Sequence, residues 1–363
     1  MTPINKNLVG IWKKINMQID YFENQNISVK IIDTNNNDRW GFLDSILRKF
    51  PFTGLHKWHI DEKMINEVEF IYIRYQNSDF QFIKMLKNIK NSNPDIKIII
   101  EIPTYPYDNE VKLSLKNLTI LSKDRWNRRK LHKFVDKILT FSNDEMIFNI
   151  PTLKLSNAVN TNIITMKKVA TATENINVIA VANYVFWHGY DRFLEGMYKY
   201  YKSNNPSVKI NLYLVGEGDE LKRYKTLVDQ YNLNDYVEFC GRKEGIELDE
   251  IYDKCEIGLD AMGRHRSKVY YNSSLKGKEY GAKGLPIISG VETELDADPT
   301  YKYYMRVTAD DSPIDMIEVL EFYNQVYDSG ESKEKISLNI NNYTKKNFDV
   351  SVTWKKVVNY IKE

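Results

Sequence analysis

The chain has 363 residues, which is long for a single hydrophobic core and indicates two domains. Hydrophobic residues make up 42% and charged residues 28%, which excludes a disordered or collagen-like chain. Because 51 Lys and Arg residues nearly balance 49 Asp and Glu residues, the net charge of +2 excludes a global positive field that would demand nucleic acid as a partner.

The expected compartment follows from the N-terminus, the apolar runs and the cysteines. Residues 1–10 are polar and do not resemble a secretory signal, and no run approaches the roughly 20 apolar residues that span a bilayer. Cys240 and Cys255 are too few for a disulfide framework or a zinc ligand set. We therefore expect a cytoplasmic protein without a metal site.

In the first half of the chain, short runs rich in Ile, Val and Tyr alternate with amphipathic stretches. This alternation of strand with helix is typical of a parallel sheet covered on both faces. Strands are predicted at residues 27–33, 68–74, 96–102 and 137–141. An apolar period from Phe80 to Ile89 predicts a helix between two of them. These elements indicate one doubly wound domain.

The pattern restarts after residues 157–162. Strands are predicted at residues 178–181, 210–215, 236–239, 257–260 and 285–288. Helices are predicted at residues 192–201, 221–231, 247–254 and 275–282, and a polar region, 329–342, precedes a final amphipathic stretch, 351–361. The Asn-rich pieces 35–38 and 339–342 are predicted to be loops. A second domain of the same kind follows from this order.

Glycines follow one of these strands directly, at Gly216 and Gly218. Ligands bind at the carboxyl ends of parallel strands, where glycine lets the backbone approach them closely. A strand can also end in glycine simply to turn, so this signal is weak without its context.

The context is the stretch from Asn272 to Pro286. Ser273 or Ser274 can cap a helix whose exposed N–H groups and dipole favour a phosphate, and Lys276 adds a charge there. Glu279, one turn further on, can accept two hydrogen bonds from a ribose diol. The alternative is an ordinary amphipathic helix with solvated Lys and Glu side chains.

The order of these motifs resembles the nucleotide-sugar-binding half of GT-B glycosyltransferases, notably family 4. The resemblance covers residues 178–290 and rests on four strings of residues. They are Val215–Glu220, Glu238–Gly241, the series Leu248, Ile251, Tyr252, Cys255 and Ile257, and the series Lys276, Glu279, Tyr280, Gly284, Leu285 and Pro286. Residues 136–142 and 155–158 resemble the last strand and the domain-joining segment of the family's first domain. Residues 101–108 resemble a subset that builds capsular or exopolysaccharides.

The resemblance implies an α/β fold of two Rossmann-like, doubly wound domains that face a cleft. It divides the chain into an acceptor-side domain, 1–162, a nucleotide-sugar-binding domain, 163–345, and a C-terminal helix, 346–363, that crosses back to the first domain. The family opens with an apolar strand before a Gly-containing loop, whereas this chain reaches Gly10 at once. The first domain therefore lacks its usual first strand: either the start is truncated, or another segment or a subunit of the same or another kind fills the gap.

The resemblance also implies roles for single residues. It puts Glu279 on the ribose, the backbone near Ser273–Lys276 on the phosphates, and Gly241 and Arg242 beside the base. The family's basic pair falls on Asn183 and His188, so His188, Arg192, Arg264, Arg266 and Lys268 are candidates for the missing charge. For His188 a packing role beside Trp187 is the alternative. We take Glu279, Lys276 and His188 as the catalytic candidates. The carboxylate that normally touches the donor sugar is replaced by Tyr271.

The acceptor-side candidates are Gly10, Arg74, Glu101, Tyr105, Tyr107 and Asp108. The stretch from Arg125 to Lys133 holds several Arg and Lys residues and one Trp, which suits anionic lipid headgroups at the inner face of the membrane or a lipid diphosphate acceptor; a solvated helix face is the alternative.

The implied function is transfer of a hexose from a nucleotide-diphosphate sugar to a polysaccharide or lipid-linked acceptor, with retention of configuration and no cofactor. An inverting route would need a base such as Glu101 or Asp108. The alternatives are a catalytically inactive binding subunit of a glycosyltransferase complex and, last, a nucleotide-sugar epimerase.

Overall fold

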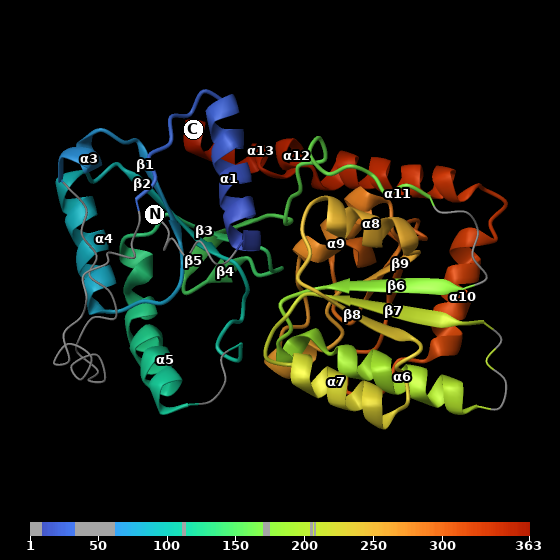
Figure 1. The fold of residues 1–363 in the computed structure, drawn as a ribbon. Coiled ribbons are helices and arrows are strands. Elements are labelled where there is room, and N and C mark those ends of the chain that lie inside the picture. Colours follow the sequence, from blue (N-terminus) through green and yellow to red (C-terminus); the bar gives the residue numbers. More distant parts are fainter. Residues whose placement is uncertain (1–8, 33–61, 111–113, 170–174, 204–205, 207) are drawn as a thin grey trace. The chain divides into compact units, whose positions relative to one another are not determined.

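The computed structural model describes residues 9–32, 62–110, 114–169, 175–203, 206 and 208–363. The chain divides into two compact units, residues 1–155 with 354–363, and residues 156–353. Each unit contains its own sheet, and neighbouring strands pair in parallel except for one short hairpin. Figure 1 shows both units. The predicted fold class, two parallel-sheet α/β domains, is confirmed.

The first unit is built on a sheet with the strand order β1-β2-β3-β5-β4. Its strands are β1 (Phe70–Arg74), β2 (Lys97–Ile102), β3 (Lys137–Thr140), β4 (Met146–Ile147) and β5 (Ile150–Lys154). Its helices are α1 (Val9–Asn24), α3 (Glu62–Asn66), α4 (Phe80–Ser92), α5 (Leu115–Asn127), the 3-10 helix η1 (Arg128–Lys133) and α13 (Lys355–Lys362).

Alternation along the strands of the first unit separates its two faces. Ile71 and Ile73 of β1 join a buried cluster with Phe82 and Leu86 of α4. The other face of β1 presents Tyr72, which contacts Trp354 just before α13 with ring centroids 6.1 Å apart. The helical and strand periods in the sequence thus match the burial of each face.

The second unit has the strand order β11-β10-β9-β6-β7-β8. The strands are β6 (Ile176–Val181), β7 (Ile210–Val215), β8 (Val237–Gly241), β9 (Ile257–Leu259), β10 (Ile287–Ser289) and β11 (Tyr304–Arg306). The helices are η2 (Phe186–His188), α6 (Tyr190–Lys202), α7 (Leu221–Gln230), α8 (Ile246–Lys254), η3 (Arg264–Ser267), α9 (Leu275–Lys283), η4 (Glu294–Ala297), α10 (Met316–Tyr327), α11 (Lys333–Phe348) and α12 (Val350–Thr353).

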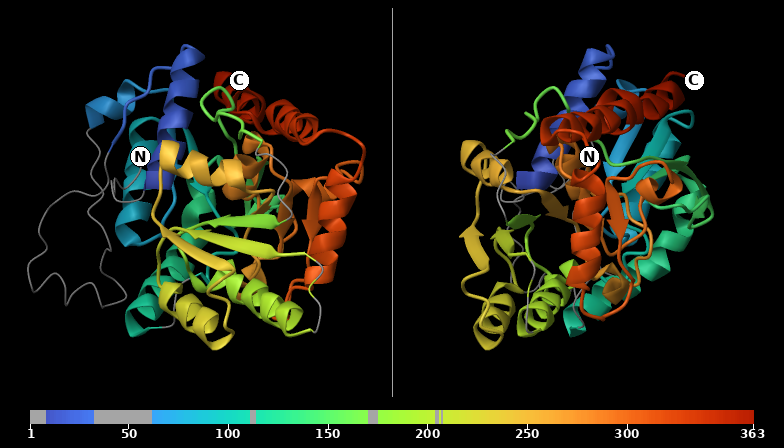
Figure 2. Two further views of the ribbon diagram at one scale, coloured as in Figure 1. Left: turned by 45° about the vertical axis from the view of Figure 1, so that its right-hand side comes forward. Right: turned by 90° about the vertical axis from the view of Figure 1, so that its right-hand side faces the viewer.

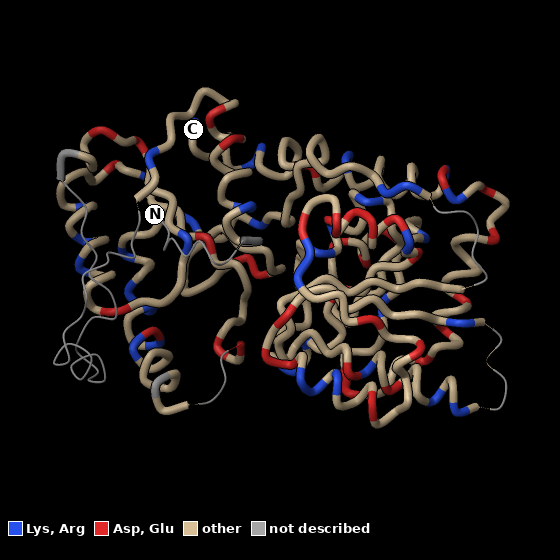
Figure 3. Tube along the Cα trace, in the orientation of Figure 1, with Lys and Arg blue, Asp and Glu red and all other residues tan. Residues whose placement is uncertain are grey.

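Helices cover both faces of the second sheet: α6 and α7 lie on one face, and α8, α9 and α11 lie on the other (Figure 2). The strands β6, β7, β9 and β10 contain no charged residue, and the charges lie mostly on helices and loops (Figure 3). Strands without charged side chains are expected where both faces of a parallel sheet are covered.

Two predictions about local structure are wrong. The described part of the predicted strand at residues 27–33, residues 27–32, forms no strand; it lines a pocket beside β1, where Lys30 pairs with Glu67. The predicted loop at residues 339–342 lies inside α11, because Ile336 and Ile340 are buried against the second core and hold the helix despite its Asn residues. The Asn-rich piece 35–38 lies outside the described residues.

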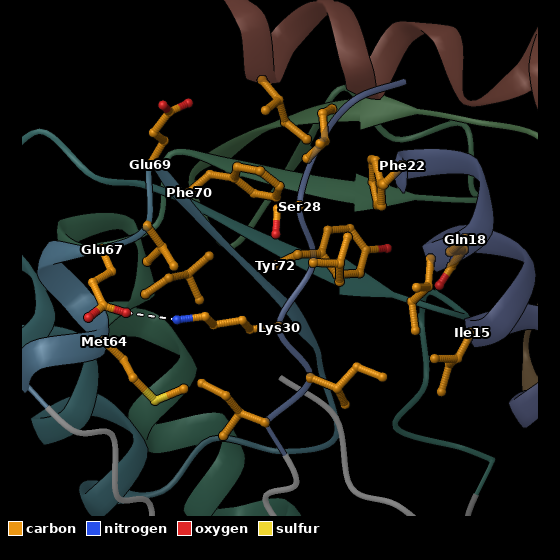
Figure 4. A pocket seen from close by; sticks show the side chains of 18 of the residues that line it. Ile15, Gln18, Phe22, Ser28, Lys30, Met64, Glu67, Glu69, Phe70 and Tyr72 are labelled. Carbon is orange, nitrogen blue, oxygen red and sulfur yellow. Dashed lines mark hydrogen bonds and ion pairs between the residues drawn. The ribbon is translucent and has the colours of Figure 1, made fainter. Parts of the chain in front are cut away.

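Within residues 9–32 and 62–69, no strand precedes β1, which forms one edge of its sheet. Gly10, one of the acceptor-side candidates, lies in α1. The edge of β1 borders a pocket of about 520 Å³, lined largely by apolar side chains that include Ile15, Phe22 and Met64 (Figure 4).

Candidate functional site

The loops that follow β6 and β7 pack on each other at the carboxyl ends of these strands, and the loop after β7 also bonds to the last residue of β8. Gly216 has φ +129°, and a Cβ atom there would lie 1.9 Å from the carbonyl oxygen of Ala182. Gly218 has φ +141°, and its Cβ would lie 2.4 Å from the backbone of Tyr184. The N–H of Gly216 donates to the carbonyl of Gly241 at 2.8 Å. The three predicted glycines therefore come together, and close loop packing requires the first two.

The start of α9 is held by serines that are almost completely buried. Ser274 caps the helix by accepting the N–H of Gly277 at 3.3 Å, and its hydroxyl donates to Oδ1 of Asp260 at 2.6 Å. Ser273 Oγ accepts the N–H of Asn157 at 2.7 Å. Both hydroxyl groups thus organise the loop, and the helix N-terminus with its backbone N–H groups is the part of this segment that suits an anion.

Lys276 and His188, two of the catalytic candidates, are in direct contact. The Nζ atom of Lys276 lies 3.0 Å from Nε2 of His188. His188 ends η2, is buried, and stacks on Tyr190 with ring centroids 5.7 Å apart. Burial is the main cause that holds the pKa of His188 well below its usual value, and the charge of Arg264 lowers it further. The lowered pKa favours a neutral imidazole. The packing alternative holds in part, because the ring stacks on Tyr190 and also contacts Lys276.

Gly189 follows His188 in the left-handed region, with φ +65°. A Cβ atom at this position would lie 2.5 Å from the backbone nitrogen of Gly263. The carbonyl of His188 accepts the N–H of Met262 at 2.7 Å. The loop after β9 therefore fixes the backbone at His188 and Gly189.

The arginine candidates have different surroundings. Arg192 is buried and donates to the carbonyl oxygens of Ser312, at 2.7 Å, and Met262, at 2.5 Å. Arg266 forms two hydrogen bonds with Asp191, at 2.9 and 2.8 Å, and another with Asp311. Arg242 pairs with Glu244 on the surface, and Asn183 is exposed. Arg264, whose guanidinium lies over Trp187, is the candidate whose charge acts on both His188 and Lys276.

Glu279 is partly exposed on α9, one turn beyond Lys276. Its negative charge acts on Lys276 and favours the charged form of the amine, whereas burial lowers the pKa of Lys276. The carboxylate of Glu279 thus acts electrostatically on the amine of Lys276 from the same helix.

Two acidic residues of this region were not identified from the sequence as part of the site. Asp260 directly follows β9, whereas the predicted strand, 257–260, included it. A carboxylate just after a parallel strand can face a ligand or organise the loop, and this position was the signal that could have identified it. Glu294 of η4 pairs with Lys278 at 2.6 Å. Tyr271 stands where the family has a carboxylate. Burial is the main cause that raises the pKa of this tyrosine, and the charges of Glu294 and Glu292 raise it further.

The acceptor-side candidates of the first unit are tied into ionic networks. Glu101 is fully buried and accepts from Arg74 at 2.6 Å, from Lys14 at 3.0 Å and from Gln18 at 3.2 Å. It also accepts a short hydrogen bond from Tyr72. A carboxylate that is saturated in this way has no lone pair to offer an acceptor hydroxyl.

The remaining acceptor-side candidates lie on the loop after β2. Asp108 is bound by Arg125 at 2.9 Å and by Arg128 at 2.7 Å. Tyr107 donates to Asp124 at 2.6 Å, and Tyr105 packs edge-on against Phe148. Part of the basic stretch from Arg125 to Lys133 is therefore neutralised internally.

Within the described residues, no group of three or more His, Cys, Asp or Glu side chains is arranged to hold a metal ion. Among the helices that the structure describes, none has the length and apolar character of a membrane span.

Solved structures with the same fold include three bacterial proteins. A protein of Anabaena, HepE, in complex with UDP, is 13% identical, with a TM-score of 0.60 over 94% of this chain and 88% of that one. A glycosyltransferase of Rickettsia africae is 11% identical, with a TM-score of 0.60 over 95% and 86%. The lipopolysaccharide outer core galactosyltransferase WaaB, in its apo form, is 11% identical, with a TM-score of 0.60 over 99% and 98%. At these identities the likeness concerns the fold.

Comparison with curated proteins gave no match. Residues 162–259 match the family model described as glycosyl transferases group 1. The match covers β6 to β9, the strands whose carboxyl ends carry the glycine loops and His188.

Proposed function

We propose that the chain transfers a hexose from a nucleotide-diphosphate sugar to a polysaccharide or lipid-linked acceptor. The observation that carries the proposal is the pair of side-chain nitrogens, Lys276 Nζ and His188 Nε2, which lie 3.0 Å apart beside the N-terminus of α9. Two basic groups and a helix N-terminus form a suitable site for a diphosphate. The match of residues 162–259 to glycosyl transferases group 1, and the HepE structures with UDP and UDP-glucose, support the same reading.

Each part of the site has a role in this proposal. Lys276, His188 and the first N–H groups of α9 hold the two phosphates, and Glu279 accepts the ribose hydroxyls. Gly216, Gly218 and Gly241 let the loops approach the nucleotide, and Arg242 lies beside the base. Arg264 adds a cation next to the phosphates, whereas Arg192 and Arg266 act by holding the loops in place.

The reaction then depends on stabilising the departing diphosphate. Donors that are already oriented toward the phosphates gain strength as negative charge develops on the leaving oxygen. With retention of configuration, this oxygen takes the proton of the acceptor hydroxyl, and no protein carboxylate is needed as a base. The buried, ion-paired state of Glu101 disfavours the inverting alternative that would use it.

The second candidate is a binding subunit that keeps the fold and the nucleotide but not catalysis. Tyr271 in place of a carboxylate and the exposed Asn183 in place of an arginine favour it. Association of this chain with itself or with another subunit stays a prediction from the sequence.

One experiment separates the two functions. The chain is incubated with a panel of nucleotide sugars, and we measure thermal stabilisation, donor hydrolysis and transfer to lipid-linked acceptors. Turnover with any donor supports the transferase, and stabilisation by a nucleoside diphosphate without turnover supports the binding subunit. Glu279→Ala should weaken nucleotide binding at least tenfold, as loss of about 1.4 kcal/mol does. The exposed Glu250→Ala of α8 serves as the matched control.

We also propose that α5 and η1 contact an anionic membrane surface during the reaction. Leu115, Leu118 and Trp126 of α5 are 87%, 46% and 64% exposed. Arg129, Lys130 and Lys133 follow in η1. Exposed apolar side chains beside basic residues suit an interface that binds anionic headgroups.

Vesicle sedimentation tests this surface. The chain should bind vesicles that contain anionic lipid more strongly than neutral ones, and Arg129→Glu with Lys133→Glu should abolish the difference. Lys84→Glu with Lys87→Glu, two exposed lysines of α4, should leave it unchanged. Equal binding by both double variants would contradict the proposed surface.

A further inference from the structure

The hydrogen bonds of His188 define which of its nitrogens carries the proton. The backbone N–H of Val185 donates to Nδ1 of His188 at 3.1 Å. An imidazole nitrogen that accepts a hydrogen bond has no proton of its own, so the ring is neutral and its single proton sits on Nε2. The Nε2–H group is therefore a donor, and it points toward Lys276.

This assignment constrains the charge of Lys276. A lysine ammonium group carries three donors and no acceptor. At 3.0 Å, two donors cannot form a hydrogen bond with each other, whereas a neutral amine accepts the Nε2–H through its lone pair. The geometry is thus that of a neutral lysine bound to a neutral histidine.

The groups around the pair explain how a neutral lysine can exist there. Burial lowers the pKa of Lys276, and the charge of Arg264 lowers it further. Asp260 and Glu279 act in the opposite direction. Asp260 is also held by the hydroxyls of Ser274 at 2.6 Å and Ser289 at 3.4 Å.

We propose that Lys276 and His188 form a proton-coupled clamp for the diphosphate. In the arrangement seen here, the Lys276 amine accepts a hydrogen bond from His188 Nε2–H. When a nucleoside diphosphate binds, Lys276 takes up a proton from solvent, and both nitrogens donate to phosphate oxygens. The step balances, since one solvent proton is consumed for each amine that becomes ammonium. This inference rests on the proposed function and adds a regulation by pH to the same site.

The direction of the pH dependence follows from proton linkage. Where Lys276 is already protonated before binding, no proton is taken up and the affinity does not depend on this group. At higher pH, binding must take up this proton from solvent, so each pH unit weakens the affinity for the nucleotide by up to about tenfold. The affinity therefore falls as the pH rises through the lowered pKa of Lys276.

Isothermal titration of the full chain with UDP measures the proton directly. The binding heat is recorded in buffers of different ionisation enthalpy at one mildly alkaline pH, where phosphate, with a second pKa of about 6, is already fully ionised. The slope of heat against buffer enthalpy gives the number of protons taken up. We expect an uptake approaching one proton per UDP for the natural chain, rising with pH.

Lys276→Arg is the decisive variant. Arginine stays charged throughout this pH range, so the variant should bind UDP with an uptake near zero and with an affinity that no longer falls at alkaline pH. Lys222→Met, at an exposed lysine of α7, should behave like the natural chain. Far-UV circular dichroism verifies that each variant is folded.

The outcomes are distinguishable. UDP binding with heats that do not depend on the buffer would overturn the clamp and leave the nucleotide site intact. An uptake that persists in Lys276→Arg would assign the proton to another group and also overturn the clamp. If neither UDP nor the corresponding adenosine and guanosine diphosphates bind the folded chain, both the clamp and the proposed function fail.

Discussion

The carboxylate of Glu101 lies 2.6 Å from the guanidinium group of Arg74, and Glu101 is fully buried. Lys14 of α1 adds a second cation at 3.0 Å, so the ion cluster ties α1 to β1 and β2. Removing one charge from a buried ion pair leaves its partners uncompensated, which costs about 3–5 kcal/mol.

Glu101→Gln should therefore lower the free energy of unfolding by about 3 kcal/mol, measured by urea denaturation. The matched control is Glu145→Gln, because Glu145 pairs with Lys154 at the surface with 82% of its side chain exposed. The control should change stability by less than about 1 kcal/mol. Equal effects of the two substitutions would show that the buried cluster contributes no more than a surface pair.

The Glu101 cluster also predicts an acid dependence of stability. Burial alone would raise the pKa of Glu101, but Lys14 and Arg74 outweigh it and lower the pKa from 4.5 to about 2. The unfolded chain thus takes up this proton first, so the stabilisation is complete above pH 4.5 and is lost as the pH falls toward 2. The stability difference between the natural chain and Glu101→Gln should shrink over this interval, measured by denaturation at a series of pH values. A constant difference would contradict the lowered pKa.

The close packing of the loop after β7 predicts an unequal response of two glycines. Gly218→Ala places a Cβ 2.4 Å from the backbone of Tyr184 at φ +141°, so backbone must move, and we expect a loss of stability of more than about 2 kcal/mol. Gly241 has φ +65° with nothing within 4 Å of its Cβ, so Gly241→Ala should cost about 1 kcal/mol. Thermal unfolding compares the two variants. A Gly218→Ala variant no less stable than Gly241→Ala would contradict the role assigned to the loop contact.

The environment of Arg266 predicts a strong pairwise coupling. Two of its nitrogens bind the two carboxylate oxygens of Asp191 at 2.9 and 2.8 Å. A double-mutant cycle with Arg266→Ala and Asp191→Ala should give a coupling energy of about 1–3 kcal/mol in urea denaturation. The exposed pair of Arg242 and Glu244, at 2.9 Å, should give less than about 1 kcal/mol. If Arg266 and Asp191 show no coupling and Arg266→Ala loses much of its UDP affinity, Arg266 would be assigned to phosphate binding rather than to holding the loop.

Much of the fold could be predicted because apolar runs identify buried strands without knowledge of their neighbours. The prediction at residues 210–215 coincides with β7, since this strand carries no charged residue and four of its six residues are buried. The same reasoning failed at residues 27–33, where apolar residues line a pocket instead of joining the ladder. The loop predicted from the Asn-rich piece 339–342 was wrong for a different reason: the burial of Ile336 and Ile340 in α11 depends on a core that the local sequence does not reveal.

The candidate site could be predicted only where its chemistry is local. The serine cap, Lys276 and Glu279 lie on one helix, so their spacing identified them. The partners of the arginines could not be predicted, because Arg266 and Asp191 are 75 residues apart. Distant residues also decide the state of Lys276, since His188 reaches it from 88 positions away. Such contacts depend on which strand ends the topology brings together.

The hydrogen bond between Ser274 and Asp260 predicts that two similar helix caps differ in energy. Ser274 and Ser332 both accept an N–H three residues on, at 3.3 Å, in α9 and α11. Loss of a serine cap costs about 1 kcal/mol, so Ser332→Ala should lower the free energy of unfolding by about that amount. Ser274→Ala also removes the hydroxyl that donates to Oδ1 of buried Asp260 at 2.6 Å, which adds about 1–3 kcal/mol for an unsatisfied acceptor. Urea denaturation of both variants measures the difference, and equal losses would mean that Asp260 finds another donor.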